Sequence, residues 1–292
     1  MSRNTERNQS HAGIVDPSDL ENLRESGLTD QTIRENELYT CRDHKRIVEI
    51  LGCGPNSNPA MGGLVFPYPD LKGETNGFAR LRPHFPRIIK GKPAKYEQPK
   101  GAGNRTYYPR ASLPLLTDPS EPLLITEGEK KSLALSQLGL AAVGLGGVWN
   151  WTKGDRKDEL IDDLAAVVLP GRTVYIGFDF DPKLKTRHAV QNATRRLATA
   201  LAEAGAGEIF RIDLPAGEDG GKQGVDDFLV GRGKAAFGKL VEQAKLIPPS
   251  KRPLENFDPM EAARRFIDEC HLTSDEELKL RHWNGEYHEW RE

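Results

Sequence analysis

The chain has 292 residues, of which 37% are hydrophobic and 29% charged, and its formal net charge is −2. This length is enough for one large or two ordinary domains with a sizeable core. No apolar run approaches the length of a membrane span and the segment from Met1 to Leu20 is mostly polar, so we expect a cytoplasmic protein with no secretory signal and no membrane partner.

The first part of the chain predicts a small α+β subdomain over residues 13–117, after a polar tail of residues 1–12 that we expect to be disordered. Capping residues and glycines mark short helices, and strand-like segments on both sides of a turn mark a hairpin. The predicted elements are two capped helices joined at Gly27, a helix over Asp43–Leu51, and a hairpin of Gly62–Asp70 with Gly77–Arg82.

Positive charge is concentrated in this subdomain. Between Lys72 and Arg110, ten lysines and arginines stand against two glutamates, which gives this stretch a charge of +8 and leaves −10 for the rest of the chain. Strand alternation places Arg80 and Arg82 on one side of the hairpin, which favours a shared anionic ligand. The stretch therefore favours contact with nucleic-acid or nucleotide phosphates, whereas a solvated basic face is the simpler reading of residues 87–100 taken in isolation.

From Asp118 onward, strands and helices alternate and predict one α/β domain over residues 118–246. Short apolar runs with polar flanks are typical of buried parallel strands, and the helices between them act as crossovers. The longest helix carries an apolar stripe that includes Val190, Leu197 and Leu201, which indicates packing on the sheet. The predicted strands are 123–126, 141–145, 173–178 and 208–214, and the predicted helices are 129–138, 157–165 and 186–204.

Acidic residues follow two of these strands. Glu127 ends the first, and Asp179 and Asp181 follow a later one. The carboxyl ends of parallel strands form the ligand-binding edge of an open α/β sheet, so we expect the three carboxylates to lie together. Packed carboxylates repel unless cations compensate them, and their oxygens suit Mg²⁺ or Mn²⁺. The simpler alternatives are a carboxylate that complements a helix dipole and a polar strand-end turn.

Three acidic motifs together resemble the Toprim domain, which DnaG-type primases, topoisomerases and some nucleases share. They are Glu127-Gly128, Asp179-x-Asp181 and Gly224-Val225-Asp226-Asp227. With the glycine-rich segment 144–149, the sequence Glu-Gly-Glu-Lys-Lys at 127–131 resembles the Toprim branch found in phage and plasmid primase-helicases. The preceding helices, hairpin and Lys95-Tyr96 are similar to the amino-terminal half of the DnaG core. The resemblance implies an α/β fold in which a Toprim-like compact parallel sheet flanked by helices follows a smaller DnaG-like α+β subdomain.

The resemblance also implies a site. Glu127, Asp179 and Asp181 would be the catalytic acids, and Asp226 would join them as an outer ligand of Mg²⁺ or Mn²⁺. A Gly-x-Asp-Asp sequence also forms a turn and a helix N-cap, which is the alternative for Asp226 and Asp227. The residues implied to contact template or nucleotides are Arg80, Arg82, Lys95, Arg105 and Lys130.

Cysteine spacing and the tail bear on cofactors and partners. Cys41, Cys53 and Cys270 lack Cys-x-x-Cys spacing, so no zinc is expected, although DnaG-type primases usually carry a zinc module. Residues 247–257 have the composition of a linker. Residues 258–292 predict a helix over 258–270 and a hairpin at Asn284-Gly285. This tail resembles the start of a helicase-associated region, so the chain fits a fragment of a longer primase-helicase.

The resulting hypothesis is a metal-dependent DNA primase core. It would make primers from nucleoside triphosphates on single-stranded DNA, for a phage, plasmid or other mobile element, with a replicative helicase in cis or in trans. The alternatives are a Toprim nuclease, which the basic DnaG-like half argues against, and a non-catalytic DNA-binding or helicase-loading module, which the intact acids argue against. A topoisomerase would need a domain with a tyrosine nucleophile. The sequence leaves open whether primers are RNA or DNA.

Overall fold

The computed structural model describes residues 14–54, 59–89, 91–154, 156–248, 280–283 and 286–289. The chain falls into two compact units, Met1–Pro249 and Ser250–Glu292. The predicted tail of residues 1–12, the predicted helix over 258–270 and most of the predicted linker lie outside the described residues. The predicted boundary between residues 117 and 118 falls within the first unit and stays a prediction.

The amino-terminal part of the first unit contains the predicted helices and hairpin. They are α1 (Pro17–Glu25), α2 (Asp30–Glu35), β1 (Tyr39–Cys41), α3 (His44–Ile50), β2 (Gly63–Pro69) and β3 (Thr75–Pro83), with the strands paired in the order β1-β2-β3. Thr29 caps α2 by accepting a hydrogen bond from the Thr32 N–H at 3.1 Å, and Asp43 caps α3 in the same way. α1 has no side-chain cap, and Pro17 at its start has no N–H to satisfy.

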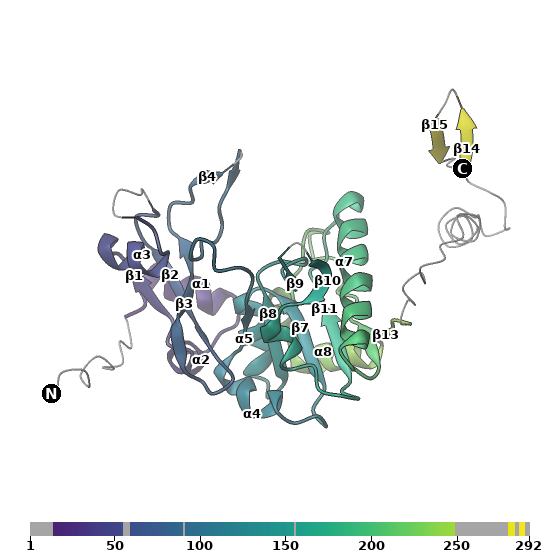
Figure 1. Cartoon of the computed structure of the whole chain (residues 1–292), viewed down its shortest axis with the longest axis horizontal. Helices are drawn as coiled ribbons and strands as arrows, with labels where there is room; N and C mark the ends of the chain where they lie inside the picture. The colour runs from purple at the N-terminus through teal and green to yellow at the C-terminus, as the bar shows by residue number, and fades with distance from the viewer. Residues whose placement is uncertain are drawn as a thin grey trace. The chain divides into compact units, whose positions relative to one another are not determined.

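Both faces of this three-stranded sheet are buried. Successive side chains point to opposite sides, and the side chains of each side pack in a hydrophobic cluster of their own. Val65 and Leu81 pack in a cluster with α3. Phe66 and Phe78 pack on the other face in a cluster that includes Leu133 of α5 (Glu129–Ser136). Figure 1 shows α5 between the two sheets of the unit. The amino-terminal sheet is therefore joined to the α/β part through this helix.

The second part of the unit is built on a six-stranded, mostly parallel sheet. Its order is β13-β12-β11-β7-β8-β6, in which the central four strands are parallel and the two edge strands antiparallel. This confirms the predicted fold class. The strands are β6 (Thr106–Tyr107), β7 (Leu123–Glu127), β8 (Ala141–Leu145), β11 (Val174–Gly177), β12 (Ile209–Arg211) and β13 (Lys245–Leu246).

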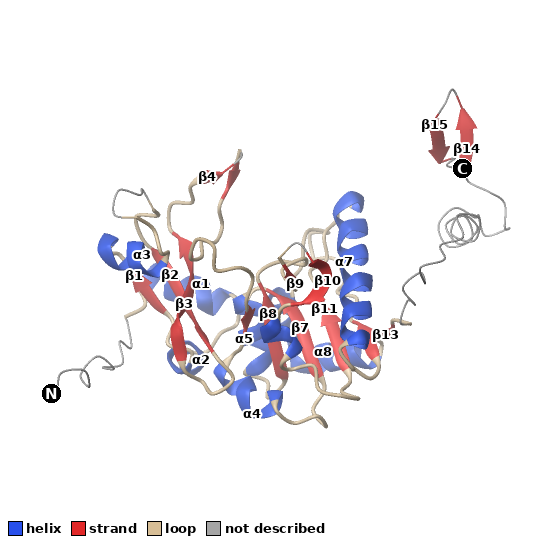
Figure 2. Cartoon of the chain, viewed as in Figure 1, coloured by secondary structure: helices blue, strands red, loops and turns tan. Residues whose placement is uncertain are grey.

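Helices cover both faces of this sheet (Figure 2). Leu123 and Ile125 of β7 pack in one cluster with Leu197 and Leu201, while Leu124 packs in a cluster on the other face. A strand buried on both faces explains the continuous apolar run in the sequence. The helices are η1 (Arg110–Ser112), α4 (Leu113–Leu116), α5, α6 (Asp162–Ala165), α7 (Leu184–Glu203) and α8 (Val225–Glu242), which is interrupted at Gly233.

The predicted helix over 157–165 is wrong in its first half. β10 (Arg156–Leu160) pairs antiparallel with β9 (Thr152–Lys153), and only Asp162–Ala165 is helical. The Ile161 N–H donates to the Trp151 carbonyl at 2.8 Å, and the Trp151 side chain is fully buried. Asp158 is also ion-paired with Arg196 of α7. Long-range pairing and packing therefore override a local sequence of good helix formers.

The second unit is described over one hairpin. β14 (Leu280–Trp283) pairs antiparallel with β15 (Glu286–Glu289), with Trp283 opposite Glu286. This confirms the hairpin predicted from Asn284-Gly285. Among the described residues of both units, no helix is long and apolar enough to cross a membrane.

Candidate functional site

Three acids lie at the carboxyl edge of the parallel sheet. Glu127 ends β7, Asp179 follows β11 by two residues, and Asp226 lies in the first turn of α8. β7 and β11 are paired in parallel, so their carboxyl ends meet at the same edge. Gly128 follows Glu127 with a φ of 92°, a left-handed conformation that favours glycine and turns the chain directly into α5. Strand register therefore places Glu127 and Asp179 at one edge, as the sequence predicted, whereas the start of α8 supplies Asp226.

Asp179 and Asp226 converge around Gly224. A Cβ at Gly224 would lie 2.6 Å from Asp226 Oδ1 and 3.3 Å from Asp179 Oδ1. Both residues are more than nine-tenths buried, at 8% exposure for Asp179 and 5% for Asp226. Both Oδ1 atoms lack a hydrogen-bond partner among the described residues. Two buried, unsatisfied carboxylate oxygens aimed at one point are costly unless a cation binds there.

Two lysines, which sequence reasoning did not select as partners of the acids, compensate Asp179. Lys131 Nζ lies 3.2 Å and Lys222 Nζ 3.1 Å from Asp179 Oδ2. Lys131 lies in the first turn of α5, which begins two residues after Glu127, so its side chain lies close to the sheet edge. Lys222 lies in the loop before α8. Its position shortly before Asp226 is the one feature of the sequence that could have marked it as part of the site.

Electrostatics in the cluster follow from burial and these neighbours. Burial, and then the charge of Asp179, raise the pKa of Glu127 above its ordinary value of 4.5, against the opposing charges of Lys131, Lys222 and Lys95. Burial also raises the pKa of Asp226 above 3.8. Burial disfavours the charged form of Lys131, but Asp179, Asp226 and Glu127 together hold its pKa above 10.5. The site is therefore a coupled set of acids and ammonium groups.

The raised pKa of Asp226 predicts a pH dependence of stability. Between its ordinary pKa of 3.8 and its higher folded value, the folded protein binds more protons than the unfolded chain. The contribution of Asp226 to the free energy of unfolding therefore falls as the pH rises through that interval. In metal-free buffer, Asp226→Asn is expected to gain stability relative to the wild type as the pH rises from below 3.8 towards neutrality. Thermal unfolding of both proteins over this range measures the difference, and parallel pH profiles would contradict it.

Asp181 and Asp227 have local roles in the structure. Asp181 Oδ1 accepts a hydrogen bond from the Lys183 N–H at 2.9 Å, a turn just before α7. Asp227 Oδ2 accepts from the Gly224 N–H at 2.9 Å and so caps α8. The strand-end turn and the N-cap were the simpler alternatives for these two residues. The metal role expected of Asp181 stays a prediction.

The donor set fits a hard divalent cation, although the described residues contain no group of three or more His, Cys, Asp or Glu arranged to hold one. Two unpaired carboxylate oxygens surround one point, and Glu127 supplies a third carboxylate close enough to Asp179 for their charges to interact. Hard oxygen ligands of this kind suit Mg²⁺ or Mn²⁺. Lys131 and Lys222 also supply positive charge at Asp179.

Glu129, the first residue of α5, binds Arg80 across the two parts of the unit. The Arg80 Nη1 and the Tyr68 hydroxyl each donate to Glu129 Oε1 at 2.7 Å. Arg80 also stacks on the Tyr96 ring, 4.6 Å from its centroid. The side chains are 10% exposed for Arg80 and 1% for Glu129. The sequence predicted Arg80 at phosphates. The structure gives it a buried protein partner, and its contact with a nucleotide stays a prediction.

The other predicted cations are distributed over the amino-terminal part. Asn22 of α1 accepts hydrogen bonds from both Arg82 and Lys130, and Lys130 also donates to the Ser26 hydroxyl at 2.7 Å. Lys95 is exposed. Since its charge acts on Glu127, Lys95 is the predicted cation that best combines solvent access with proximity to the acids. Alternation does place Arg80 and Arg82 on one face of β3, but this face is turned towards α1 and α5.

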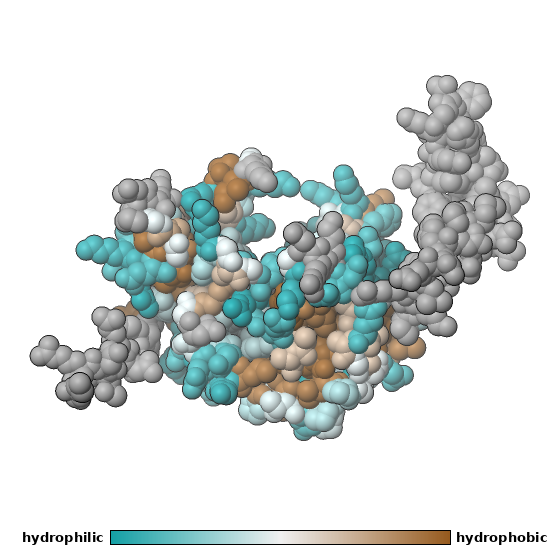
Figure 3. Space-filling view, in the orientation of Figure 1, coloured by the Kyte–Doolittle hydropathy of each residue, from teal (hydrophilic) through white to brown (hydrophobic). Residues whose placement is uncertain are grey.

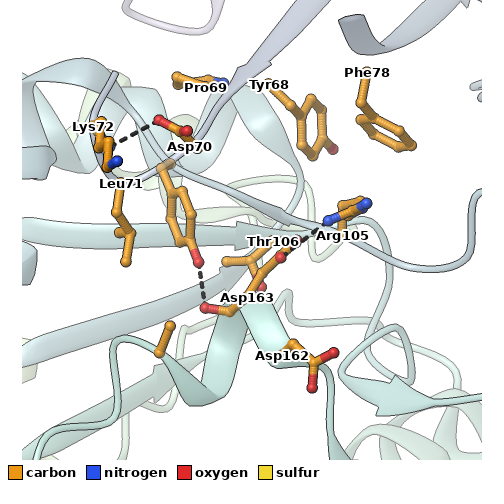
Figure 4. Close-up of a pocket in the computed structure, with 12 residues that line it drawn as sticks. Tyr68, Pro69, Asp70, Leu71, Lys72, Phe78, Arg105, Thr106, Asp162 and Asp163 are labelled. Carbon is orange, nitrogen blue, oxygen red and sulfur yellow. Dashed lines mark hydrogen bonds and ion pairs between the residues drawn. The ribbon is translucent and has the colours of Figure 1, made fainter. Parts of the chain in front are cut away.

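Arg105 lies in a separate pocket of about 310 Å³ (Figure 4). Tyr68 and Phe78 form part of its wall, and Arg105 Nη1 lies 3.2 Å from Asp163 Oδ1. None of the clustered acids is among the described residues that line this pocket. The structure therefore separates Arg105 from the acidic site.

An exposed apolar surface lies on the short hairpin of β4 (Ile88–Ile89) and β5 (Lys92–Pro93). Phe85, Ile88 and Ile89 are all exposed. The surface is brown in Figure 3 at the position of β4 in Figure 1. Sequence reasoning selected the charges of this stretch and missed its apolar side chains. Exposed aromatic residues beside cations are typical of surfaces that bind single-stranded nucleic acids.

Comparison with known sequences finds partial matches. Residues 114–236 match a family model described as a domain of unknown function, DUF3854. An uncharacterized protein of Picosynechococcus sp. (strain ATCC 27264 / PCC 7002 / PR-6) is 33% identical over 140 residues, which are 45% of this chain and 14% of that protein. The chain therefore spans a small part of that relative.

Comparison with solved structures gives the fold. The DnaG primase catalytic domain bound to ssDNA superposes with a TM-score of 0.56 at 17% identity, over 92% of this chain and 81% of that one. The RNA polymerase domain of Mycobacterium tuberculosis primase DnaG has a TM-score of 0.55 at 16% identity, with 85% and 84% covered. The zinc-binding and RNA polymerase domains of the Aquifex aeolicus primase give 0.55 at 18% identity, with 79% of this chain and 57% of that one covered. The chain has the fold of the DnaG catalytic core, as the sequence resemblance predicted.

Proposed function

We propose that this chain is the catalytic core of a DNA primase, which joins nucleotides into primers on single-stranded DNA by metal-dependent nucleotidyl transfer. The observation that supports it most directly is the meeting of Glu127, Asp179 and Asp226 at the carboxyl edge of a DnaG-like sheet, with two carboxylate oxygens left unpaired. Its expected setting is the host cytoplasm, in the replication of a phage, plasmid or other mobile element beside a replicative helicase.

The acids and the lysines of the site have different roles in the proposed reaction. Asp179, Asp226 and Glu127 would hold Mg²⁺ or Mn²⁺, which supplies positive charge for the triphosphate and the attacking 3′-hydroxyl. Asp181 is the further predicted ligand. Glu127 is also the candidate general base that would accept the proton of that hydroxyl. Lys131 and Lys222 offset negative charge when the phosphates arrive.

Template binding is assigned to the basic amino-terminal part. One of the similar structures is a DnaG catalytic domain bound to ssDNA, and this chain presents exposed Lys95 and exposed Phe85, which precedes β4, in that part. Cations neutralise phosphates and exposed aromatic rings stack on bases. Together they form a surface suited to a single strand of any sequence.

Lys95→Ala is expected to weaken binding to single-stranded DNA and to lower the slope of log affinity against log salt by about 0.7 for each phosphate that the lysine neutralises. Fluorescence anisotropy with labelled oligonucleotides at several salt concentrations measures both quantities. Lys239→Ala is the control, because Lys239 is an exposed lysine near the end of α8 opposite to Asp226. If the slope of log affinity against log salt is the same for the wild type and Lys95→Ala, Lys95 does not contact DNA and is only a solvated surface residue.

The proposed activity is tested by incubating the chain with single-stranded DNA, labelled NTPs or dNTPs, and Mg²⁺ or Mn²⁺. New oligomers that depend on the template and on the divalent cation are the expected result. Shortened template without incorporation would instead identify a nuclease, since the same carboxylates support hydrolysis by a metal-bound water. Binding without either reaction would identify a non-catalytic DNA-binding module.

A further inference from the structure

Asp179 is held between two ammonium groups that differ in how firmly the protein fixes them. Both nitrogens contact the same oxygen, Oδ2, at 3.2 Å for Lys131 and 3.1 Å for Lys222. The Lys131 side chain is 20% exposed and the Lys222 side chain 54%. One carboxylate oxygen therefore has one enclosed and one solvent-exposed cation.

Lys131 is built into the cluster. It extends from α5, and a Cβ at Gly224 would lie 2.4 Å from its Cε, so glycine at that position makes room for the side chain. The positive charge of Lys131 is balanced by three acids around it, Asp179, Asp226 and Glu127. Removing this ammonium would leave three carboxylates without an enclosed counter-charge.

Lys222 belongs to a more open segment. It lies in the connection between β12 and α8, preceded by Gly217, Gly220 and Gly221. Its ammonium contacts Asp179 alone among the ion pairs of the described residues. A half-exposed lysine on a glycine-rich loop loses little when it leaves such a pair, because water replaces the carboxylate.

Counted over Glu127, Asp179, Asp226, Lys131 and Lys222, the formal charge favours the departure of one ammonium when a divalent cation binds. Three acids and two lysines have a formal charge of −1, and a divalent cation added to them would make it +1. Departure of one ammonium brings the cluster to neutrality. The two unpaired oxygens, Asp179 Oδ1 and Asp226 Oδ1, are already oriented to one point, so the cation would approach Asp179 beside the lysine contacts.

We propose that Lys222 is an exchangeable counter-ion of Asp179: its ammonium and a divalent cation compete for the Asp179 carboxylate, while Lys131 remains in place. The inference rests on the proposed function only in taking a divalent cation as the ligand of the site. In this arrangement Lys222 stabilises the metal-free site, and cation binding releases a lysine beside the position that a substrate phosphate would take.

Lys222→Met is expected to bind Mn²⁺ about fivefold more tightly than the wild type, because the cation no longer has to displace an ammonium from a half-exposed pair with Asp179. Electron paramagnetic resonance of free Mn²⁺, or calorimetric titration, measures the affinity without any need for activity. Lys153→Met is the matched control, since Lys153 is an exposed lysine paired with a carboxylate, Asp162, outside the cluster. It should bind Mn²⁺ as the wild type does.

A second measurement follows the lysine itself. In the wild-type chain, Mn²⁺ is expected to raise the rate at which Lys222 reacts with an amine-acylating reagent, read by peptide mass spectrometry, while the rates at Lys131 and Lys153 stay the same. Lys222→Gln provides a second neutral variant, and Asp179→Asn added to Lys222→Met should abolish the gain in Mn²⁺ affinity.

Mn²⁺ affinity in Lys222→Met and Lys222→Gln equal to or below that of the wild type would overturn the inference, as would absence of Mn²⁺ binding in all three proteins. A gain in affinity with no primer synthesis by the wild type would sustain the exchange and reject the primase assignment. Primer synthesis by the wild type, with no gain in Mn²⁺ affinity in the Lys222 variants, would reject the exchange and support the primase assignment.

Discussion

Arg80→Met is expected to lower the free energy of unfolding by about 3–5 kcal/mol. The substitution removes the partner of Glu129 and leaves a carboxylate that is 1% exposed, with the Tyr68 hydroxyl as its remaining hydrogen-bond donor among the described residues. Glu129 Oε2 is already without a partner there. An isolated charge in such a place costs far more than the ion pair contributes, so the loss comes mainly from the residue left behind. Denaturant unfolding of both proteins measures the difference.

The double variant Arg80→Met with Glu129→Gln separates this explanation from a loss of packing. Removing both charges should restore most of the stability, because no buried charge is then unpaired. Arg82→Met is the matched control: Arg82 is on the same strand, but its partner is the neutral Asn22, so the expected loss is about 0.5–1.5 kcal/mol. If the double variant is no more stable than Arg80→Met, the stacking of Arg80 on Tyr96 rather than the ion pair holds the two parts together.

Glu127→Gln is expected to lower nucleotide incorporation by about 10²- to 10⁴-fold, the range for loss of a general base. The amide cannot accept the hydroxyl proton and is a weaker metal ligand than the carboxylate. Affinity for single-stranded DNA should change little, because that binding is assigned to the basic part. Stability at neutral pH should not fall, because the raised pKa shows that the site disfavours the ionised form of Glu127.

Primer-extension rates and oligonucleotide affinities measured on the same preparations test this prediction. Glu121→Gln is the control, since Glu121 lies just before the amino end of β7 while Glu127 ends the same strand. An equal loss of DNA affinity and of incorporation in Glu127→Gln would assign Glu127 to template binding. Metal-dependent cleavage of the template by the wild type, with no incorporation of NTPs or dNTPs, would overturn the primase assignment itself.

The sequence by itself determined the parallel strands β7 and β8, the long helix α7 and the sheet edge on which Glu127 and Asp179 lie. Apolar runs at 123–126 and 141–145 correspond to β7 and β8, because strands buried on both faces leave a continuous apolar signal. The acid at the end of β7 and those after β11 were assigned to one edge because parallel strands share their carboxyl ends. Asp43 marked the start of α3 because capping depends on neighbours only a few residues away. Each of these signals lies in neighbouring residues or in the periodicity of apolar residues along the sequence.

The tertiary structure alone decided which charges meet. Alternation predicted that Arg80 and Arg82 share a face of β3, but only the packing of this face on α1 and α5 shows that Arg80 is held by Glu129. Lys222 and Asp179 are 43 positions apart in the sequence, and their contact follows from the return of the chain to the sheet edge before α8. The strand β10 replaced a predicted helix for the same reason. An ion pair or a strand pair depends on the partner's position in space, which composition and periodicity along the chain do not contain.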